Sequence, residues 1–388
     1  MFSCMLGIAA ADVFGNFYYT DNGTTITIDG YVADMPGPLV IPSTIPVQEE
    51  PLVTKPVTAI ASQAFFNFSA TSISIPEGVL SIDFYAFYSC AVAETITLPE
   101  TLESIGFGAF TNCFALKNIE IPASAATLGA DLFISCTSLK SITVSAGNPN
   151  FSSVDGVLFN KDQKHLIAYP GGRGGGYAVP AGTTNIDTNA FQFCSEVTSV
   201  TIPSSISELG NGAFYICGKL SLLSFLGDAP ILGSYALAGV APGFVIHVTS
   251  SAAGYDVAPW DVYTKVIMGP PTPVTDWLLS FGYPTNTDLQ SDHNGDGVSF
   301  LMACALNLNP NQNLSGSLPQ PVFAENQMSL SFYAGTGGIS YVVEASPDML
   351  TWSTDDVTQS PPDGELISTA SVAIPGQARY MRLKVINN

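Results

Sequence analysis

An acidic stretch in the last third of the sequence carries oxygen-bearing side chains at alternate positions. It reads Asp292-His293-Asn294-Gly295-Asp296-Gly297-Val298, which puts these side chains at positions 1, 3 and 5 and a glycine at position 6. This is the spacing of the first half of a calcium loop, in which a backbone carbonyl at position 7 adds a further ligand. A predicted helix, Ser299 to Leu306, follows directly. The stretch therefore predicts a calcium site.

The second half of this loop departs from the pattern. Position 9 is Phe300 and position 12 is Ala303, and neither side chain carries an oxygen atom. Because Ca²⁺ takes about six to eight oxygen ligands, a site with only two carboxylates should be weak or empty. Two interpretations stay open: a weak Ca²⁺ site, and a turn that the Asn-Gly-Asp-Gly sequence holds without a metal.

Residues for catalysis are scarce. The three histidines, His165, His247 and His293, fall in different segments, and neither a His-Glu-x-x-His nor a Gly-x-Ser-x-Gly motif occurs. Acid–base catalysis needs paired titratable groups with shifted pKa values. Catalytic triads assemble from distant residues, and nothing in the sequence indicates one here. We expect a protein that is not an enzyme.

A repeat of 23 residues organises the elements that must position these side chains. Cys90, Cys113 and Cys136 are separated by steps of 23, and so are Pro76, Pro99 and Pro122. Later copies, with Ala-Phe at 190–191 and 213–214, keep the same internal spacing. A fixed period in the twenties is typical of a solenoid, in which each unit covers its neighbour.

Each unit is predicted to have three parts: a short apolar pair, an Ala-Phe-x-x-Cys turn of helical or 3₁₀ type, and a strand that a proline ends. In the strand, Ile119 and Ile121 should point inward and Asn118 and Glu120 outward. Stacking should also align one inward aromatic side chain per unit. This column consists of Phe65, Phe87, Phe110, Phe133, Phe191 and Phe214.

The same alternation predicts the exposed face of the sheet, which consists of short hydroxyl side chains with a single carboxylate. Such a face can contact a protein or a glycan, or it can merely keep the protein soluble. A polysaccharide-active enzyme would need two carboxylates about 5–10 Å apart, and Glu120 stands alone. The candidate binding residues are Thr95, Thr97, Asn118, Glu120, Ser141, Thr143, Ser199 and Thr201.

Five of the seven cysteines occupy one repeat position: Cys90, Cys113, Cys136, Cys194 and Cys217. A free cysteine is among the most buried residue types. A disulfide or metal ladder is the alternative, but no Cys-x-x-Cys pair occurs. We therefore favour a column of buried thiols.

The pattern Ile-x-x-x-Ala-Phe-x-x-Cys-x-x-Leu-x-x-Ile-x-Ile-Pro resembles the BspA-type leucine-rich repeats of bacterial surface proteins. The resemblance covers about 57–260, and the longer unit at 153–170 is similar to a hairpin variant of that family. It implies a curved solenoid and a role in adhesion or protein contact at the cell surface.

The acidic stretch resembles the dockerin-like or thrombospondin-type calcium loops of secreted bacterial proteins. Carried over by position, Asp292, Asn294 and Asp296 would bind the metal by side chain and Val298 by its carbonyl.

The segment 317–388, with several short strands, resembles a fibronectin-III-like module, which implies a small β-sandwich.

The amino-acid composition limits the classes of partner that the chain can bind. Of 388 residues, 32 are acidic and 11 basic, for a net charge of −21. This charge repels nucleic acid and anionic membranes and suits divalent cations. No run of eighteen apolar residues occurs, so no membrane span is expected. Few lysines among many Ser, Thr and Asn residues are typical of a secreted protein.

We therefore predict a mainly β chain with five segments. They are a signal peptide remnant at 1–11, a solenoid at 12–268, a linker at 269–275, a helix-loop-helix at 276–311 and a β-sandwich at 317–388. A hairpin at 17–40 should cap one end of the solenoid, and Tyr255 and Trp260 should plug the other. The glycine-rich segment 171–176 is expected to be a flexible loop.

The function predicted from these features is binding or adhesion at the surface or outside the cell, with a protein or glycan as partner. Two alternatives stay open. One is a polysaccharide-active enzyme on a parallel β-helix-like scaffold, and the other is a structural spacer without a specific ligand.

Overall fold

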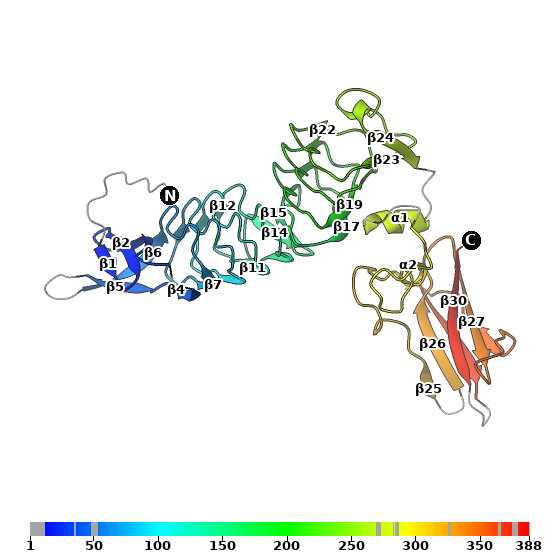
Figure 1. Ribbon diagram of the computed structural model, residues 1–388. Helices are drawn as coiled ribbons and strands as arrows, with labels where there is room; N and C mark the ends of the chain where they lie inside the picture. The colour runs from blue at the N-terminus through cyan, green and yellow to red at the C-terminus, as the bar shows by residue number, and fades with distance from the viewer. Residues whose placement is uncertain are drawn as a thin grey trace. The chain divides into compact units, whose positions relative to one another are not determined.

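The computed structural model describes residues 12–34, 36–47, 53–268, 273–281, 283, 287–324, 327–363, 366–374 and 379–387. The predicted signal peptide remnant and residues 269–272 of the predicted linker lie outside this part of the chain. One compact unit comprises Met1–Gly175 with Val179–Val266, and the other comprises Gly176–Ala178 with Ile267–Asn388. Strands dominate both units, as predicted (Figure 1). No helix within the described ranges is long and apolar enough to cross a membrane.

The solenoid begins with an antiparallel cap. β1 (Asp12–Phe14), β2 (Phe17–Asp21) and β3 (Ile26–Tyr31) pair in succession, and β3 then pairs in parallel with β6 (Val53–Ile60). β4 (Gly37–Val40) pairs with β7 (Ala70–Ser74), and β5 (Thr44–Val47) pairs with β6. The hairpin predicted at 17–40 is confirmed for 17–31, whereas 37–40 pairs with the other sheet, so the cap adds strands to both sheets of the solenoid.

A first stack of repeats follows, with two parallel sheets. The long-strand sheet has the order β13-β11-β9-β7-β4, and the short-strand sheet ends in β6-β8-β10-β12. A strand of each sheet alternates along the chain. The strands are β7 (Ala70–Ser74), β8 (Ser81–Ile82), β9 (Thr95–Thr97), β10 (Ser104–Ile105), β11 (Asn118–Ile121), β12 (Thr127–Leu128) and β13 (Ser141–Val144).

The Ala-Phe-x-x-Cys turns form the third side of the stack, and they are not helical. Tyr85 and Ser89 have left-handed backbone angles, with φ of 54° and 58°. The N–H groups of Tyr85, Phe87 and Ser89 each donate to a carbonyl of the next repeat at 2.9 Å. A helix would direct these donors along its own axis. Here they hold neighbouring repeats together, so the predicted helical or 3₁₀ turn is wrong.

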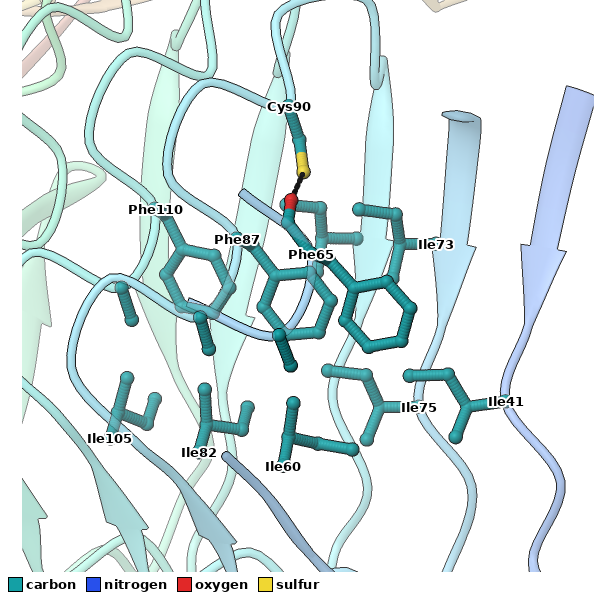
Figure 2. Packing of buried hydrophobic residues seen from close by; sticks show 14 of the residues in the cluster. Ile41, Ile60, Phe65, Ile73, Ile75, Ile82, Phe87, Cys90, Ile105 and Phe110 are labelled. Carbon is teal, nitrogen blue, oxygen red and sulfur yellow. Dashed lines mark hydrogen bonds between the residues drawn. The ribbon is translucent and has the colours of Figure 1, made fainter. Parts of the chain in front are cut away.

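The aromatic column lies between the two sheets, as predicted. Phe65 and Phe87 stack with ring centroids 5.3 Å apart, and Phe110 follows Phe87 at 5.9 Å (Figure 2). All three rings are fully buried. The thiol of Cys90 donates to the carbonyl of Phe65 at 3.3 Å. Each unit therefore finds its apolar partners in the adjacent unit, which makes the stack cooperative.

An inserted hairpin separates the first stack from the second, as predicted. β14 (Phe151–Val154), β15 (Val157–Asn160) and β16 (His165–Ala168) are antiparallel. Asp155 and Gly156 form the tight turn, with φ of 49° and 73°.

The glycine-rich segment is packed, so the prediction of a flexible loop is wrong. Gly171 and Gly172 are buried. A Cβ atom at Gly172 would lie 2.6 Å from backbone atoms of Thr137 and Ser138. The Gly172 N–H also donates to the carbonyl of Leu139 at 2.8 Å. Glycine is needed here because the backbone passes against another repeat.

The second stack repeats the architecture of the first. Its sheets have the orders β14-β15-β16-β18-β20-β22 and β17-β19-β21-β23-β24. Phe225, Tyr255 and Trp260 close its end, with ring centroids 5.1–5.4 Å apart. The predicted aromatic plug is confirmed. The strands are β17 (Gly175–Ala178), β18 (Asn185–Ile186), β19 (Val197–Ile202), β20 (Glu208–Leu209), β21 (Leu222–Phe225), β22 (Ile231–Leu232), β23 (Val245–Thr249) and β24 (Thr264–Met268); the 3₁₀ helix η1 is Trp260–Val262.

The long segment of the other unit, Ile267–Asn388, contains two short helices, α1 (Pro273–Ser280) and α2 (Phe300–Ala305). α1 begins inside the range predicted as a linker, because proline fits the first turn of a helix. Ser299 caps α2 by accepting the N–H of Met302 at 3.3 Å. The helix expected after the acidic stretch is therefore present.

Two antiparallel sheets complete this unit, with orders β25-β26-β29-β28 and β27-β30. Leu330, Phe332 and Ala370 of the larger sheet share a core with Val343 of the smaller one. Side chains alternate along 381–385, with residues 382 and 384 exposed and 381, 383 and 385 half-buried. The strands are β25 (Val322–Ala324), β26 (Gln327–Tyr333), β27 (Ile339–Ser346), β28 (Val357–Gln359), β29 (Ile367–Ala373) and β30 (Tyr380–Asn387).

Candidate functional site

The long-strand sheet of the first stack presents most of the predicted binding residues in register. Asn118 pairs with Thr95 on one side and Ser141 on the other, and Glu120 pairs with Thr143. The inward partners Ile96, Ile119 and Ile142 are buried, so the outward row must face away from the core. Five of its members are exposed and Ser141 is half-buried. The exposed members are Thr95, Thr97, Asn118, Glu120 and Thr143.

The chemistry of this row is that of neutral hydrogen-bonding groups. Glu120 is its one carboxylate, and it accepts a hydrogen bond from the Ser145 hydroxyl at 2.8 Å. Its register partner on β13 is Thr143, so that neighbouring strand brings no second carboxylate beside it. Lys117 and Glu94 form an exposed ion pair of 2.6 Å where these strands begin. The face can donate and accept hydrogen bonds, but it lacks an acid–base pair.

The two candidates on the second stack are not exposed. Ser199 retains 8% of its surface and Thr201 retains 3%. Leu222 stands in register beside Ser199, and it is itself 6% exposed. The predicted continuation of the hydroxyl face onto the second stack is therefore wrong.

The acidic loop is held by its own hydrogen bonds. Asp292 accepts the N–H groups of Gly295, Asp296 and Gly297 at 2.9, 3.2 and 2.7 Å. Asp296 accepts the N–H of Val298 at 2.8 Å and that of Leu314 at 2.6 Å, one on each carboxylate oxygen. These bonds lower the pKa of the Asp296 carboxyl.

The residues present do not make a complete calcium site. The side chains of Asp292, Asn294 and Asp296 with the Val298 carbonyl supply fewer ligands than the about six to eight that Ca²⁺ takes. Positions 9 and 12, Phe300 and Ala303, are buried in the apolar core, so neither side chain can contribute an oxygen. No cluster of three or more His, Cys, Asp or Glu side chains suited to a metal occurs in the described part of the chain.

A cleft that the sequence did not reveal lies where the two stacks meet. The short-strand sheet ends at β12, and the next sheet begins with the inserted hairpin. The space between them measures about 450 Å³. Gly129 and Asp131 line it from the first stack, and His165, Asp187 and Glu208 line it from the second. β12 is the last strand of its sheet and pairs on one side only, with β10, so a cleft can form beside its other edge.

Two polar pairs cross or border the cleft. The His165 Nδ1 atom lies 2.9 Å from Asp187 Oδ1, and the Asn189 amide donates to Asp131 Oδ1 at 3.0 Å. Burial raises the pKa of the Asp187 carboxyl, and the Glu208 charge adds to the rise while the His165 hydrogen bond opposes it. Sequence spacing could not find this site, because Asp131 and Asn189 are 58 positions apart.

The sequence itself matches known repeats. Residues 58–166 and 177–242 match the model of the BspA type leucine rich repeat region, in six copies. Among curated proteins, none matches this sequence.

Several solved structures are similar to this chain. A leucine rich cell surface protein of Faecalibacterium prausnitzii is 20% identical over 73% of this chain and 100% of that one, with a TM-score of 0.29. A leucine-rich repeat protein of Eubacterium ventriosum is 19% identical over 68% and 78%, with a TM-score of 0.38. The leucine rich repeat protein of T. pallidum is 26% identical over 56% and 83%, with a TM-score of 0.34.

Proposed function

We propose that this chain is a non-catalytic binding protein that works outside the cell or at its surface, and that it contacts a protein or glycan through the long-strand sheet of its first stack. One observation carries the proposal. Thr95, Thr97, Asn118, Glu120 and Thr143 form an exposed, in-register row on a rigid sheet. Parallel strands fix the spacing of these groups, which favours recognition of an extended partner.

The composition and the repeats support a location outside the cell or at its surface and a protein or glycan as partner. The charge of −21 opposes contact with nucleic acid or an anionic membrane. The outward row is neutral apart from Glu120, which suits hydrogen bonding to sugar hydroxyls or to a peptide. The BspA-type repeats in the solenoid are consistent with a surface protein.

Glycan-array and cell-binding assays on the full chain test this proposal. A Thr97→Lys/Thr143→Lys variant places two long cations on the row and should weaken binding at least about tenfold. Thr127→Lys is the matched control, because Thr127 is exposed on the short-strand sheet. Equal binding by both variants would show that the row is not the contact surface. No ligand in either assay would favour a structural spacer.

A second candidate, hydrolysis of a polysaccharide, is favoured by the cleft between the stacks. Glu208 pairs with Asn185, two positions before Asp187, and the Glu208 charge contributes to the raised pKa of the Asp187 carboxyl. A carboxyl with a raised pKa close to a second carboxylate is a pairing that a glycosidase can use. Release of reducing sugar from polysaccharides, lost in Asp187→Asn and in Glu208→Gln, would support an enzyme. Activity that survives both substitutions would remove this candidate.

A further inference from the structure

Five aromatic side chains gather on the turn side of the first stack, away from the hydroxyl row. We call them the aromatic cluster: Phe66, Phe84, Tyr85, Tyr88 and Phe107. They come from three successive repeats. Phe66, Phe84 and Phe107 keep 39%, 48% and 41% of their surface exposed, and the two tyrosines are half-buried. Contiguous exposed apolar surface of this kind marks an interaction site more often than chance packing.

Tyr85 is the centre of the cluster. Its ring contacts Phe84, Tyr88 and Phe107 with centroids 6.0, 5.2 and 5.3 Å away, at interplanar angles of 74°, 85° and 84°. Tyr88 also stacks on Phe66 at 5.0 Å and 6°. In each of the three Tyr85 contacts the edge of one ring meets the face of the other, so the ring planes form nearly right-angled corners around Tyr85. A flat sugar needs a flat platform, whereas a compact cation can contact two perpendicular faces at once.

The backbone at Tyr85 is strained. Its φ of 54° lies in the left-handed region, which a bulky residue rarely adopts. Equivalent positions in other repeats have the same left-handed angle, and they carry Gln63, Gly108, Asp131, Asn189, Gly212 and Tyr235, so the turn and not the tyrosine sets this conformation. Gly108 also makes room for the ring, because a Cβ atom there would lie 2.4 Å from Tyr85 Cε1. What distinguishes Tyr85 from the other residues at this position is its set of ring contacts with Phe84, Tyr88 and Phe107.

The stretch of sequence that supplies the cluster is acidic. Residues 57–116 contain five acidic residues and no Lys, Arg or His. Asp83 is exposed and directly precedes Phe84 in the chain. Ring faces carry negative electrostatic potential, so carboxylates and rings together attract a cation and repel an anion.

We propose that the aromatic cluster binds an arginine or lysine side chain in a basic segment of a partner protein. The cation would sit in a corner beside Tyr85, over the faces of its neighbours, with Asp83 as the nearest carboxylate in sequence. This site shares no residue with the hydroxyl row, so it stands or falls independently of the function proposed above.

Isothermal titration of the full chain with a tetra-arginine peptide at about 150 mM salt tests this proposal. Tetra-citrulline has nearly the same shape and no charge, so it should bind at least about tenfold more weakly. A Phe84→Leu/Tyr88→Leu variant keeps apolar surface but removes two ring faces, and it should weaken tetra-arginine about tenfold or more. Phe114→Leu is the matched control, because Phe114 is exposed on the same stack outside the cluster.

The Tyr85→Asn variant tests whether the Tyr85 side chain contributes to tetra-arginine binding or to the stability of the fold. Asn189 shows that asparagine accepts the same left-handed backbone, so this variant should fold with unchanged or higher melting temperature while tetra-arginine binding falls. Three results would overturn the proposal: equal binding of the two peptides, unchanged binding by the Phe84→Leu/Tyr88→Leu variant, or no heat with millimolar tetra-arginine. A Tyr85→Asn variant that loses stability but binds normally would assign Tyr85 a structural role instead.

Discussion

At the scale of single residues, the same residue type has different roles according to its place in the repeat. Phe110 is fully buried in the aromatic column, and Phe114, four positions later, is 44% exposed. Only Phe110 has both neighbours of the stack against its ring, at 5.9 Å on each side. The repeat period thus separates core phenylalanines from surface phenylalanines.

The first prediction concerns this pair. Phe110→Ala leaves a cavity between two stacked rings, and we expect it to lower the free energy of unfolding by about 3–5 kcal/mol. Phe114→Ala removes an exposed ring and should change it by less than about 1 kcal/mol. Denaturant titration followed by circular dichroism measures both. Similar losses for the two variants would contradict the assignment of the column.

A second prediction concerns the cysteine column. Each thiol donates to a carbonyl of the preceding repeats; for Cys136 the acceptor is Phe110, at 3.2 Å. Burial raises the pKa of Cys136 to about 12, so almost no thiolate forms at neutral pH. Native protein should therefore resist iodoacetamide at pH 8 and become labelled once denaturant is added. Mass spectrometry of the cysteine-containing peptides measures the extent of labelling at Cys90, Cys113, Cys136, Cys194 and Cys217. Rapid labelling of the native protein would contradict the assignment of buried thiols.

At the scale of elements, local hydrogen bonds decide the loops. Asp348 accepts the N–H groups of Leu350 and Thr351 at 2.9 and 2.8 Å in the loop after β27. These bonds lower the pKa of its carboxyl from an ordinary 3.8 to about 2. The acidic loop before α2 uses the same device, with backbone donors around Asp292 and Asp296. Both loops are organised by carboxylates that cap exposed backbone donors.

The third prediction follows from the sign of that shift. A depressed folded-state pKa stabilises the protein above pH 3.8, and this contribution is lost as the pH falls toward 2. Asp348→Asn removes the carboxylate, so its unfolding free energy should fall less steeply than that of the wild type between pH 4 and 2. Asp355→Asn, a nearby exposed carboxylate, is the control. Parallel pH curves for wild type and Asp348→Asn would refute this role.

The fourth prediction concerns Ca²⁺. If the acidic loop is a hydrogen-bonded turn with a weak residual affinity, calorimetry should show heat only at millimolar Ca²⁺, and the melting temperature should change little below that concentration. Asp296→Ala should destabilise the chain with or without Ca²⁺, because it removes the acceptor of the Val298 and Leu314 N–H groups. Micromolar affinity would show that ligands beyond Asp292, Asn294, Asp296 and Val298 exist.

At the scale of the whole molecule, the solenoid is a one-dimensional stack with aromatic plugs. Each coil contributes one ring to the column and one strand to each sheet, so the structure should tolerate the loss of one whole coil. The cap strands β1 to β3 and the plug around Trp260 cover the apolar ends, and they have no substitute among the repeats.

The fifth prediction uses this modularity. Deleting 91–113 removes one 23-residue period and joins Cys90 to Phe114 in the same phase, so the chain should fold with a lower melting temperature. Deleting 91–102 removes half a coil and puts the sheets out of phase, so it should abolish cooperative unfolding. Thermal melts of both variants by circular dichroism test this. Equal behaviour of the two deletions would contradict a stack of independent coils.

The sequence by itself determined the repeat, the inward column, the caps and the strands of the C-terminal sheets. The period of 23 and the alternation of Ile119 and Ile121 encode which side chains must be buried, and burial dominates the energetics of each coil. The sequence alone also showed that the acidic loop departs from the calcium-loop pattern, because the side chains of Phe300 and Ala303 at positions 9 and 12 lack oxygen atoms.

Only the tertiary structure decided the surfaces. The left-handed turns arise because their N–H groups bond to the next coil, a partner that local propensity does not include. The cleft between Asp131 and Asp187 and the contact of the Tyr85 ring with Phe107 depend on residues from different coils. The burial of Ser199 and Thr201 is likewise a property of the folded chain that the alternation of their strand did not predict. Periodicity specifies which side of a strand faces inward, but contacts between coils determine what lies beside each outward side chain.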